Sequence, residues 1–229
     1  MTSLFLAALF FIAIHLGISG TRARDLIVGR LGLKAYMVVF SLGSIAGIVW
    51  LISAYKAAGY VPLWGQLEWW KPVAIVLMLP AFVLVVAGLA TPNPTSVAQD
   101  GLAANPPRGL VRVTRHPFLV GVSIWAAVHL IGNGDMASVL LFGSLLIVAA
   151  LGTLSIDAKR RRASAPGVWD GFAARTSIVP FAAILGGRAD RATSWLREMG
   201  WARPAAGIAA YALMLGGHAH LIGVSPFPA

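Results

Sequence analysis

Five histidines are the residues of this 229-residue sequence best suited to chemistry, because all of them lie in or at the end of an apolar segment. They are His15, His116, His129, His218 and His220. An ionisable side chain is costly inside a bilayer, so each is a candidate functional residue. Neutral imidazole is a common axial ligand of haem iron, and helical bundles hold such cofactors between facing helices. The structural alternative is a buried histidine that only bonds a neighbouring group.

The segments that carry these histidines have the composition of membrane spans. The sequence is 58% hydrophobic and 11% charged, whereas soluble domains carry about 25% charged residues. We therefore expect an all-α, polytopic membrane helical bundle that forms a single domain over residues 1–229. A span needs about 17–25 apolar residues, which predicts six: Ser3–Ser19, Ala35–Tyr55, Pro72–Ala90, Pro117–Gly132, Ala137–Ile156 and Pro204–Ile222. The first is expected to be a retained span and not a cleaved signal peptide.

Positive charge is confined to three of the connections between these spans. All of the 18 Lys and Arg residues except Lys56 and Lys71 lie in residues 20–34, 91–116 and 157–203. The positive-inside rule then predicts that these connections are cytoplasmic and that both termini lie outside. The net charge of +10 is thus explained by contact with anionic lipid, and we expect no nucleic-acid partner. With no cysteine, disulfides, thiolate ligands and covalent haem attachment are excluded.

The depth of each histidine in its span predicts which ones can meet. A helix rises about 1.5 Å per residue, which places His129 and His218 at nearly the same level, with His220 as the alternative partner. Span one runs in the opposite direction, so His15 is expected closer in depth to His116.

Two further features surround His129 and His116. Gly121, Trp125 and His129 recur at helical spacing and share a face, where Gly121 would let a flat cofactor ring approach and Trp125 would pack on it. Ordinary helix packing is the alternative. Arg115 and His116 precede Pro117, which suits a first helical turn. At that boundary they could bind a propionate or phosphate, or simply form a capped helix start.

Taken together, these motifs resemble the NnrU family of bacterial inner-membrane proteins, which is linked to denitrification and includes the plant 15-cis-zeta-carotene isomerases. The resemblance covers nearly the whole chain and rests on His15–Leu16, Tyr36, Phe40–Leu42, Thr114–Pro117, Trp125, His129, Asn133, Asp157–Arg161 and His218–Pro226. It implies a haem b whose redox state gates rotation about a double bond of an apolar polyene. It also implies His15 and His129 as the haem-binding histidines. Ala126 stands where the plant pattern has cysteine.

A second resemblance, over Gly109–Pro180, is to isoprenylcysteine and phospholipid methyltransferases, whose Arg-His-Pro turn and later acid pair help to hold S-adenosylmethionine. Here the acid pair is reduced to Asp157. Three hypotheses follow: a haem-b protein with cis–trans isomerase activity, a membrane methyltransferase, or a non-enzymatic factor that assists expression of nitrite or nitric oxide reductase. Which histidine pairs with His129 stays open: the family resemblance implies His15, whereas the depth in the membrane favours His218. A homo-oligomer also stays open.

Overall fold

The structure is a computed structural model that describes residues 1–189 and 194–228. These residues form helices and connecting loops, and their one β-type contact is an isolated bridge between Pro62 and Asp135. The long helices are α1 (Thr2–Ile12), which continues as the π-helix η1 (Ala13–Ser19), α3 (Leu33–Lys56), α4 (Lys71–Ala90), α6 (Pro117–Asn133), α7 (Met136–Ala163) and α11 (Ala202–Ile222). The short ones are α2 (Arg22–Leu31), η2 (Glu68–Trp70), η3 (Asp100–Ala104), α5 (Leu110–Val113), α8 (Val168–Ala174), α9 (Ala182–Leu185) and α10 (Ser194–Met199).

The expected all-α membrane bundle is confirmed. Within the described residues, five helical segments are long and apolar enough to cross a membrane: α1 with η1, α3, α4 with η2, α7 and α11. The sixth expected span corresponds to α6, which is apolar but has only 17 residues.

Helix α7 is longer than the apolar segment predicted for it. It runs for 28 residues, to Ala163, through the basic stretch after Ile156. Lysine and arginine are good helix formers, and Asp157, which begins the polar stretch, turns inward to bind partners there. The boundary predicted at Ile156 therefore marks the end of the apolar stretch, whereas the helix itself continues beyond it.

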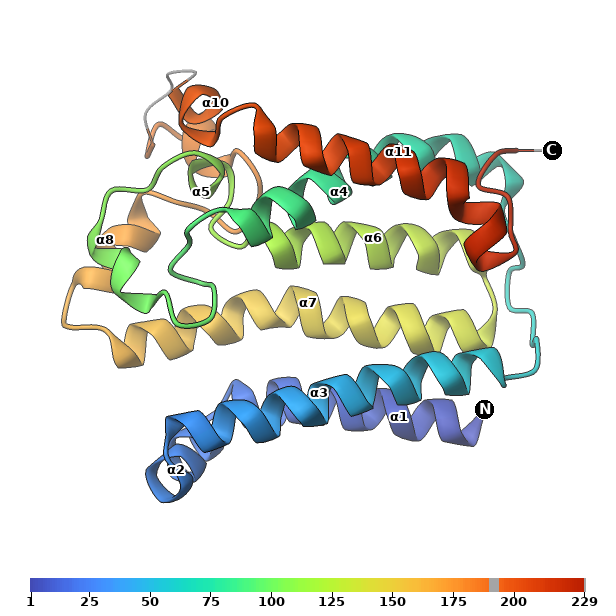
Figure 1. Ribbon diagram of the computed structural model, residues 1–229, viewed down its shortest axis with the longest axis horizontal. Coiled ribbons are helices and arrows are strands. Elements are labelled where there is room, and N and C mark those ends of the chain that lie inside the picture. The colour runs from blue at the N-terminus through green and yellow to red at the C-terminus, as the bar shows by residue number, and fades with distance from the viewer. Residues whose placement is uncertain (190–193, 229) are drawn as a thin grey trace.

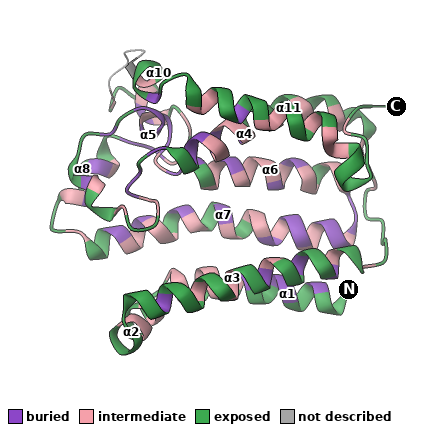
Figure 2. Ribbon diagram, viewed as in Figure 1, coloured by how far each residue is buried: buried purple, intermediate pink, exposed green. Residues whose placement is uncertain are grey.

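The long helices lie side by side in one row (Figure 1). Helix α6 packs between α4 and α7, α1 packs against both α7 and α3, and α11 packs against α4. A core of buried side chains, including Phe11, Leu51 and Phe142, joins α1, α3 and α7. The outer faces of α3 and α11 are largely exposed (Figure 2). Their exposed residues include Leu42, Val49 and Leu213, which suit contact with lipid acyl chains.

The two ends of the row differ in charge. Both termini lie at one end, and α2, α5, α8 and α10 lie at the other (Figure 1). We call these the terminal end and the basic end. The charge separation used to predict orientation is thus present in the fold.

The loop between α3 and α4 is tied to the terminal end of α6. Gly134 ends this helix in the left-handed conformation, and its carbonyl accepts hydrogen bonds from the backbone N–H groups of Leu63, Trp64 and Gly65. A Cβ on Gly134 would lie 2.2 Å from the Gly65 oxygen, so only glycine fits. The indole of Trp70 also donates to the Val128 carbonyl. These contacts hold the last turn of α6, which carries His129, in place.

Candidate functional site

The imidazole of His129 is held by its own helix. Its Nδ1 lies 2.8 Å from the Trp125 carbonyl oxygen, four residues earlier. A carbonyl only accepts, so Nδ1 must carry the proton, and in the neutral ring Nε2 then keeps its lone pair. A histidine fixed in this way through one nitrogen is arranged as metal-ligating histidines are.

Aromatic rings enclose one side of His129. The ring of Phe142, from α7, lies 5.0 Å away at an interplanar angle of 27°, and that of Trp125 lies 5.1 Å away. Trp125 and Phe142 also contact each other edge to face. Trp125 therefore packs beside His129, with which it was expected to share a helix face, and its packing on a cofactor ring stays a prediction. Phe142, on another helix, could not be assigned from sequence spacing.

His218, on α11, is the histidine that meets His129. The two ring centroids are 6.5 Å apart and the ring planes differ by 26°. The prediction from depth that these two residues lie at the same level is confirmed, whereas their role as metal ligands stays a prediction. The Nδ1 of His218 lies 2.7 Å from the Val224 carbonyl oxygen, so its Nε2 is also the nitrogen with the lone pair.

His15 has the same local arrangement at a different place. Its Nδ1 lies 2.8 Å from the Phe11 carbonyl oxygen, and its ring packs on Phe11 and on Phe40 of α3, with centroids 4.2 and 5.3 Å away. The expected approach of His15 to His116 is not seen, because the His116 ring is bound to Asp157 instead. His220 is exposed on α11.

The number of donors limits what the His129–His218 pair could hold. The described residues contain no group of three or more His, Cys, Asp or Glu side chains placed to bind a metal ion. Two imidazoles suffice for a metal that brings its other ligands with it, as haem iron does. The chemistry of these two donors is that of haem ligands, and haem binding stays a prediction.

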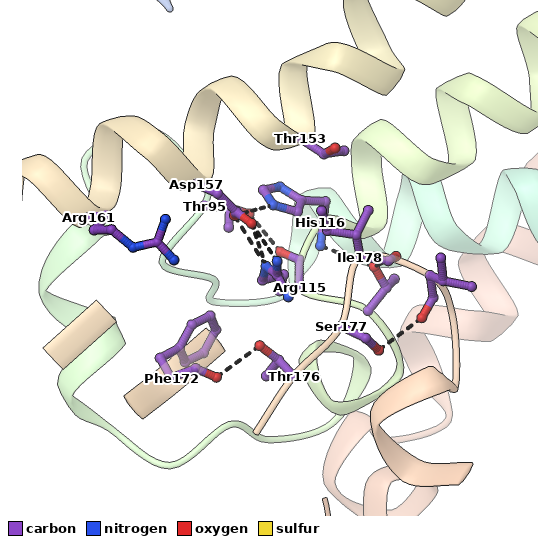
Figure 3. Close-up of polar contacts among 12 residues, drawn as sticks. Thr95, Arg115, His116, Thr153, Asp157, Arg161, Phe172, Thr176, Ser177 and Ile178 are labelled. Atoms are coloured by element: carbon purple, nitrogen blue, oxygen red, sulfur yellow. Dashed lines mark hydrogen bonds and ion pairs between the residues drawn. The ribbon is translucent and has the colours of Figure 1, made fainter. Parts of the chain in front are cut away.

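A polar cluster lies at the basic end, where α6 begins (Figure 3). The Asp157 carboxylate binds the Arg115 guanidinium, with Nε 2.9 Å from Oδ2 and a second bond from a terminal nitrogen. His116 Nε2 lies 2.7 Å from Asp157 Oδ1. The side chain of His116 is fully buried, and its Nδ1 has no hydrogen-bond partner within the described part of the chain.

The backbone around Arg115 joins three segments. The Arg115 carbonyl accepts from Asn93 Nδ2 and Thr95 Oγ1, at 3.1 and 2.8 Å. Its N–H donates to the Ser177 carbonyl, and Thr114 Oγ1 donates to the Ile178 carbonyl. The cluster thus fastens two long connections to the start of α6. One feature of the sequence could have identified Asp157 as the partner of Arg115 and His116. It is the only acidic residue between Asp135 and Asp170.

Burial lowers the pKa of His116 below its ordinary value. The hydrogen bond and the charge of Asp157 act in the opposite direction, but Arg115 already neutralises that carboxylate, so protonation of the imidazole gains little. Asp157 occupies the guanidinium of Arg115, and the predicted propionate or phosphate at Arg115 and His116 would have to share or replace this contact.

Gly121 serves helix packing, and the expected flat ring over it is wrong. A Cβ at this position would lie 2.7 Å from the Ala81 carbonyl oxygen and 2.8 Å from a Val85 methyl group. Helix α4 therefore fills the space beside Gly121. The contacts of Trp125 and His129 are with α7 instead, so the three residues do not line one surface.

Comparison with known proteins gives a family and two partial relatives. A family model described as NnrU protein matches residues 3–226. The 15-cis-zeta-carotene isomerases, chloroplastic, of Zea mays and Arabidopsis thaliana are 37% and 35% identical over 81 residues. That region is 35% of this chain and 22% of each relative, so the match spans under a quarter of their length. No solved structure matches the chain.

Proposed function

Because the chain belongs to the NnrU protein family, we propose that it is a haem-b-containing isomerase of the bacterial inner membrane that acts on an apolar polyene. The relatives named as 15-cis-zeta-carotene isomerases support the reaction class and the type of substrate. The helices long and apolar enough to cross a membrane suit a substrate that partitions into lipid.

One observation carries the proposal: His129 is fixed through Nδ1 to the Trp125 carbonyl, which leaves Nε2 as a ligand nitrogen in an apolar part of the bundle. Haem iron, when bound, supplies a Lewis acid or a one-electron partner for a conjugated double bond. The residues of the chain would bind the haem and orient the imidazole that ligates it. Trp125 and Phe142 hold the imidazole plane and exclude water from one side.

The α6 segment also suits an apolar substrate. It has no charged residue from His116 to Gly134, so a polyene could lie along it without removing water from a charge. The interaction with substrate would then be dispersion and hydrophobic burial, at about 25 cal/mol per Å² of apolar surface.

The test is a reconstituted reaction. Protein expressed with a haem supply and inserted into lipid vesicles should convert 15-cis-zeta-carotene to an isomer resolved by chromatography. His129→Ala should abolish conversion, whereas His220→Ala, a change at an exposed histidine, should not. Haem-loaded wild-type protein that leaves every cis polyene unchanged would contradict isomerase activity, and absence of a Soret band would contradict haem binding.

A second candidate, a membrane methyltransferase, is favoured by the polar cluster. The fold brings together Arg115, His116 and Asp157, the residues on which the methyltransferase resemblance rests. Titration calorimetry with S-adenosylmethionine and with S-adenosylhomocysteine tests it. Heat of binding that is lost in Arg115→Gln would support this function, and no heat with either compound would exclude it.

A further inference from the structure

A hollow of about 110 Å³ at the basic end is lined by three arginines. We call it the arginine hollow, and its walls are Pro106, Pro107, Arg112, Arg175, Arg188 and Ala189. The arginines come from separate segments, since one lies in α5, one directly follows α8 and one follows α9. A hollow of this volume holds several water molecules, so it has room for a small anion.

Backbone carbonyls hold two of these guanidinium groups in place. Arg175 Nε donates to the Gly171 carbonyl at 3.1 Å. One terminal nitrogen of Arg188 lies 3.3 Å from the carbonyl oxygens of both Ala174 and Thr176. A carbonyl carries no net charge, so both arginines stay cationic. Since a guanidinium has five N–H donors, each also has more donors than these contacts use.

The segment that supplies these carbonyls is itself fixed in the fold. Thr176 is buried, and its hydroxyl donates to the Phe172 carbonyl at 2.9 Å. The next carbonyl, of Ser177, accepts the backbone N–H of Arg115. The two guanidinium groups are thus attached to a well-anchored segment, which lowers the entropy cost of binding a ligand there.

The carboxylates of the same connection that the structure describes are bound to other arginines. Asp157 pairs with Arg115 and Asp170 pairs with Arg161. Glu198 pairs with Arg112 and so offsets the charge of one wall of the hollow. Arg175 and Arg188 pair with none of these three carboxylates. They therefore present positive charge to the hollow that an external anion could neutralise.

An apolar hollow of about 150 Å³ adjoins the arginine hollow. Pro106 and Pro107 line both. The lining of the second hollow is mainly apolar and includes Pro92, Pro94, Leu102, Val111 and Phe172. An anion with an apolar part could place its charge among the arginines and its apolar part beyond the two prolines.

Both water and lipid headgroups have access to this place. Arg175 and Arg188 are exposed, and α5 and α8 lie at the basic end, beside the ends of the long helices (Figure 1). The charge distribution predicts that this end is cytoplasmic. A ligand could therefore arrive from the membrane surface or from solution.

We propose that the arginine hollow binds a phosphate group, carried by an anionic lipid or by a soluble phosphate compound. The planar fork of arginine matches phosphate oxygens and binds them through paired hydrogen bonds. Two arginines suit a group with more than one negative charge, such as a phosphomonoester. The site uses neither His129 nor the Arg115–His116–Asp157 cluster, so it is independent of the proposed function.

Titration calorimetry of the full chain in a non-ionic detergent tests this proposal with two probes, inorganic phosphate and dihexanoyl phosphatidic acid. The double variant Arg175→Gln, Arg188→Gln should weaken binding at least about tenfold, because hydrogen bonds to a charged group are lost. The matched control is Arg22→Gln, Arg30→Gln, which removes the same charge from α2, outside the hollow. It should bind as wild type does.

A second variant, Ala189→Glu, covers the case in which the double variant does not fold. It keeps both arginines and adds a negative charge to a wall of the hollow, so binding should weaken as well. Tighter binding of phosphatidic acid than of inorganic phosphate would support a lipid as the source, and equal affinities would support a soluble phosphate compound.

Three results would overturn the proposal: no heat of binding with either probe, an equal loss of affinity in the α2 control, or unchanged binding in both variants of the hollow. The haem spectrum of the same samples should not change, because the hollow lies apart from His129.

Discussion

The two ends of α6 hold a histidine each, and they use it differently. At the basic end, His116 is bound through Nε2 to the Asp157 carboxylate and is fully enclosed. At the terminal end, His129 is bound through Nδ1 to a backbone carbonyl of its own helix and faces the ring of a second histidine. The first histidine shares a counter-charge with Arg115, whereas the second lies among aromatic rings.

This difference distinguishes the structural role of His116 from the ligand role that we propose for His129. A side chain whose partners are side chains and loops of the same fold, as in the Arg115–His116–Asp157 cluster, contributes mainly to stability. A side chain oriented by one backbone contact, with its second nitrogen left to bind, is suited to a cofactor. Loss of the cluster should therefore lower stability, whereas loss of His129, the proposed ligand, should change haem binding with little change in stability.

The largest expected effect is on stability at the basic end. Asp157→Ala leaves a guanidinium without its partner in a site where both side chains are about one-tenth exposed. Breaking such a pair costs about 3–5 kcal/mol. Unfolding titrations in detergent micelles should show this loss.

The control for Asp157→Ala is Asp170→Ala, which removes the partner of Arg161 in a pair that is more than half exposed and should change stability little, because exposed ion pairs are screened by solvent. Equal losses in the two variants would remove the distinction between the ends of α6.

The next effect concerns Gly121. Gly121→Val should separate α6 from α4 and cost about 1–3 kcal/mol, as overpacking of a close contact does. Gly143→Val, where a Cβ meets nothing within 4 Å, is the matched control. Both variants should keep the wild-type haem spectrum. A changed spectrum with unchanged stability in Gly121→Val would restore a cofactor role for this glycine.

The pH dependence of stability should report on His116. Its pKa is lowered in the folded protein, so below its ordinary value of about 6.5 the unfolded chain binds more protons. Stability should therefore decrease as the pH falls below that value. His116→Gln, which keeps a donor for Asp157, should flatten this slope in thermal unfolding between pH 7 and 5; an identical slope in the variant would assign the effect to another group.

The smallest effect is expected at the contact between α5 and α10. Glu198 binds Arg112 through both carboxylate oxygens, at 2.9 and 3.1 Å, and this contact lowers the pKa of Glu198. Glu198→Gln should cost about 1 kcal/mol or less, because the carboxylate is partly exposed. The stabilisation should be present above about pH 4.3 and be lost as the pH falls through the lowered pKa. A Glu198→Gln curve parallel to wild type through this range would contradict the contribution.

Periodicity and charge predicted much of the fold, because spans depend on properties that each segment carries alone. The same reasoning found the His129–His218 approach, since helical rise converts residue number into depth. It failed for Gly121, because the facing helix is specified by tertiary packing and not by spacing on α6. It also could not supply Phe142 or the Val224 carbonyl, since both come from parts of the chain whose orientation depends on long-range contacts.

We propose that His129 holds a haem, and the measurement that tests this most directly is the absorption spectrum of His129→Ala beside Asp157→Asn and wild type. All three are expressed with haem and purified in the same detergent. We expect the Soret band in wild type and in whatever Asp157→Asn protein remains folded, and its loss in folded His129→Ala. A wild-type Soret band in His129→Ala would contradict the account.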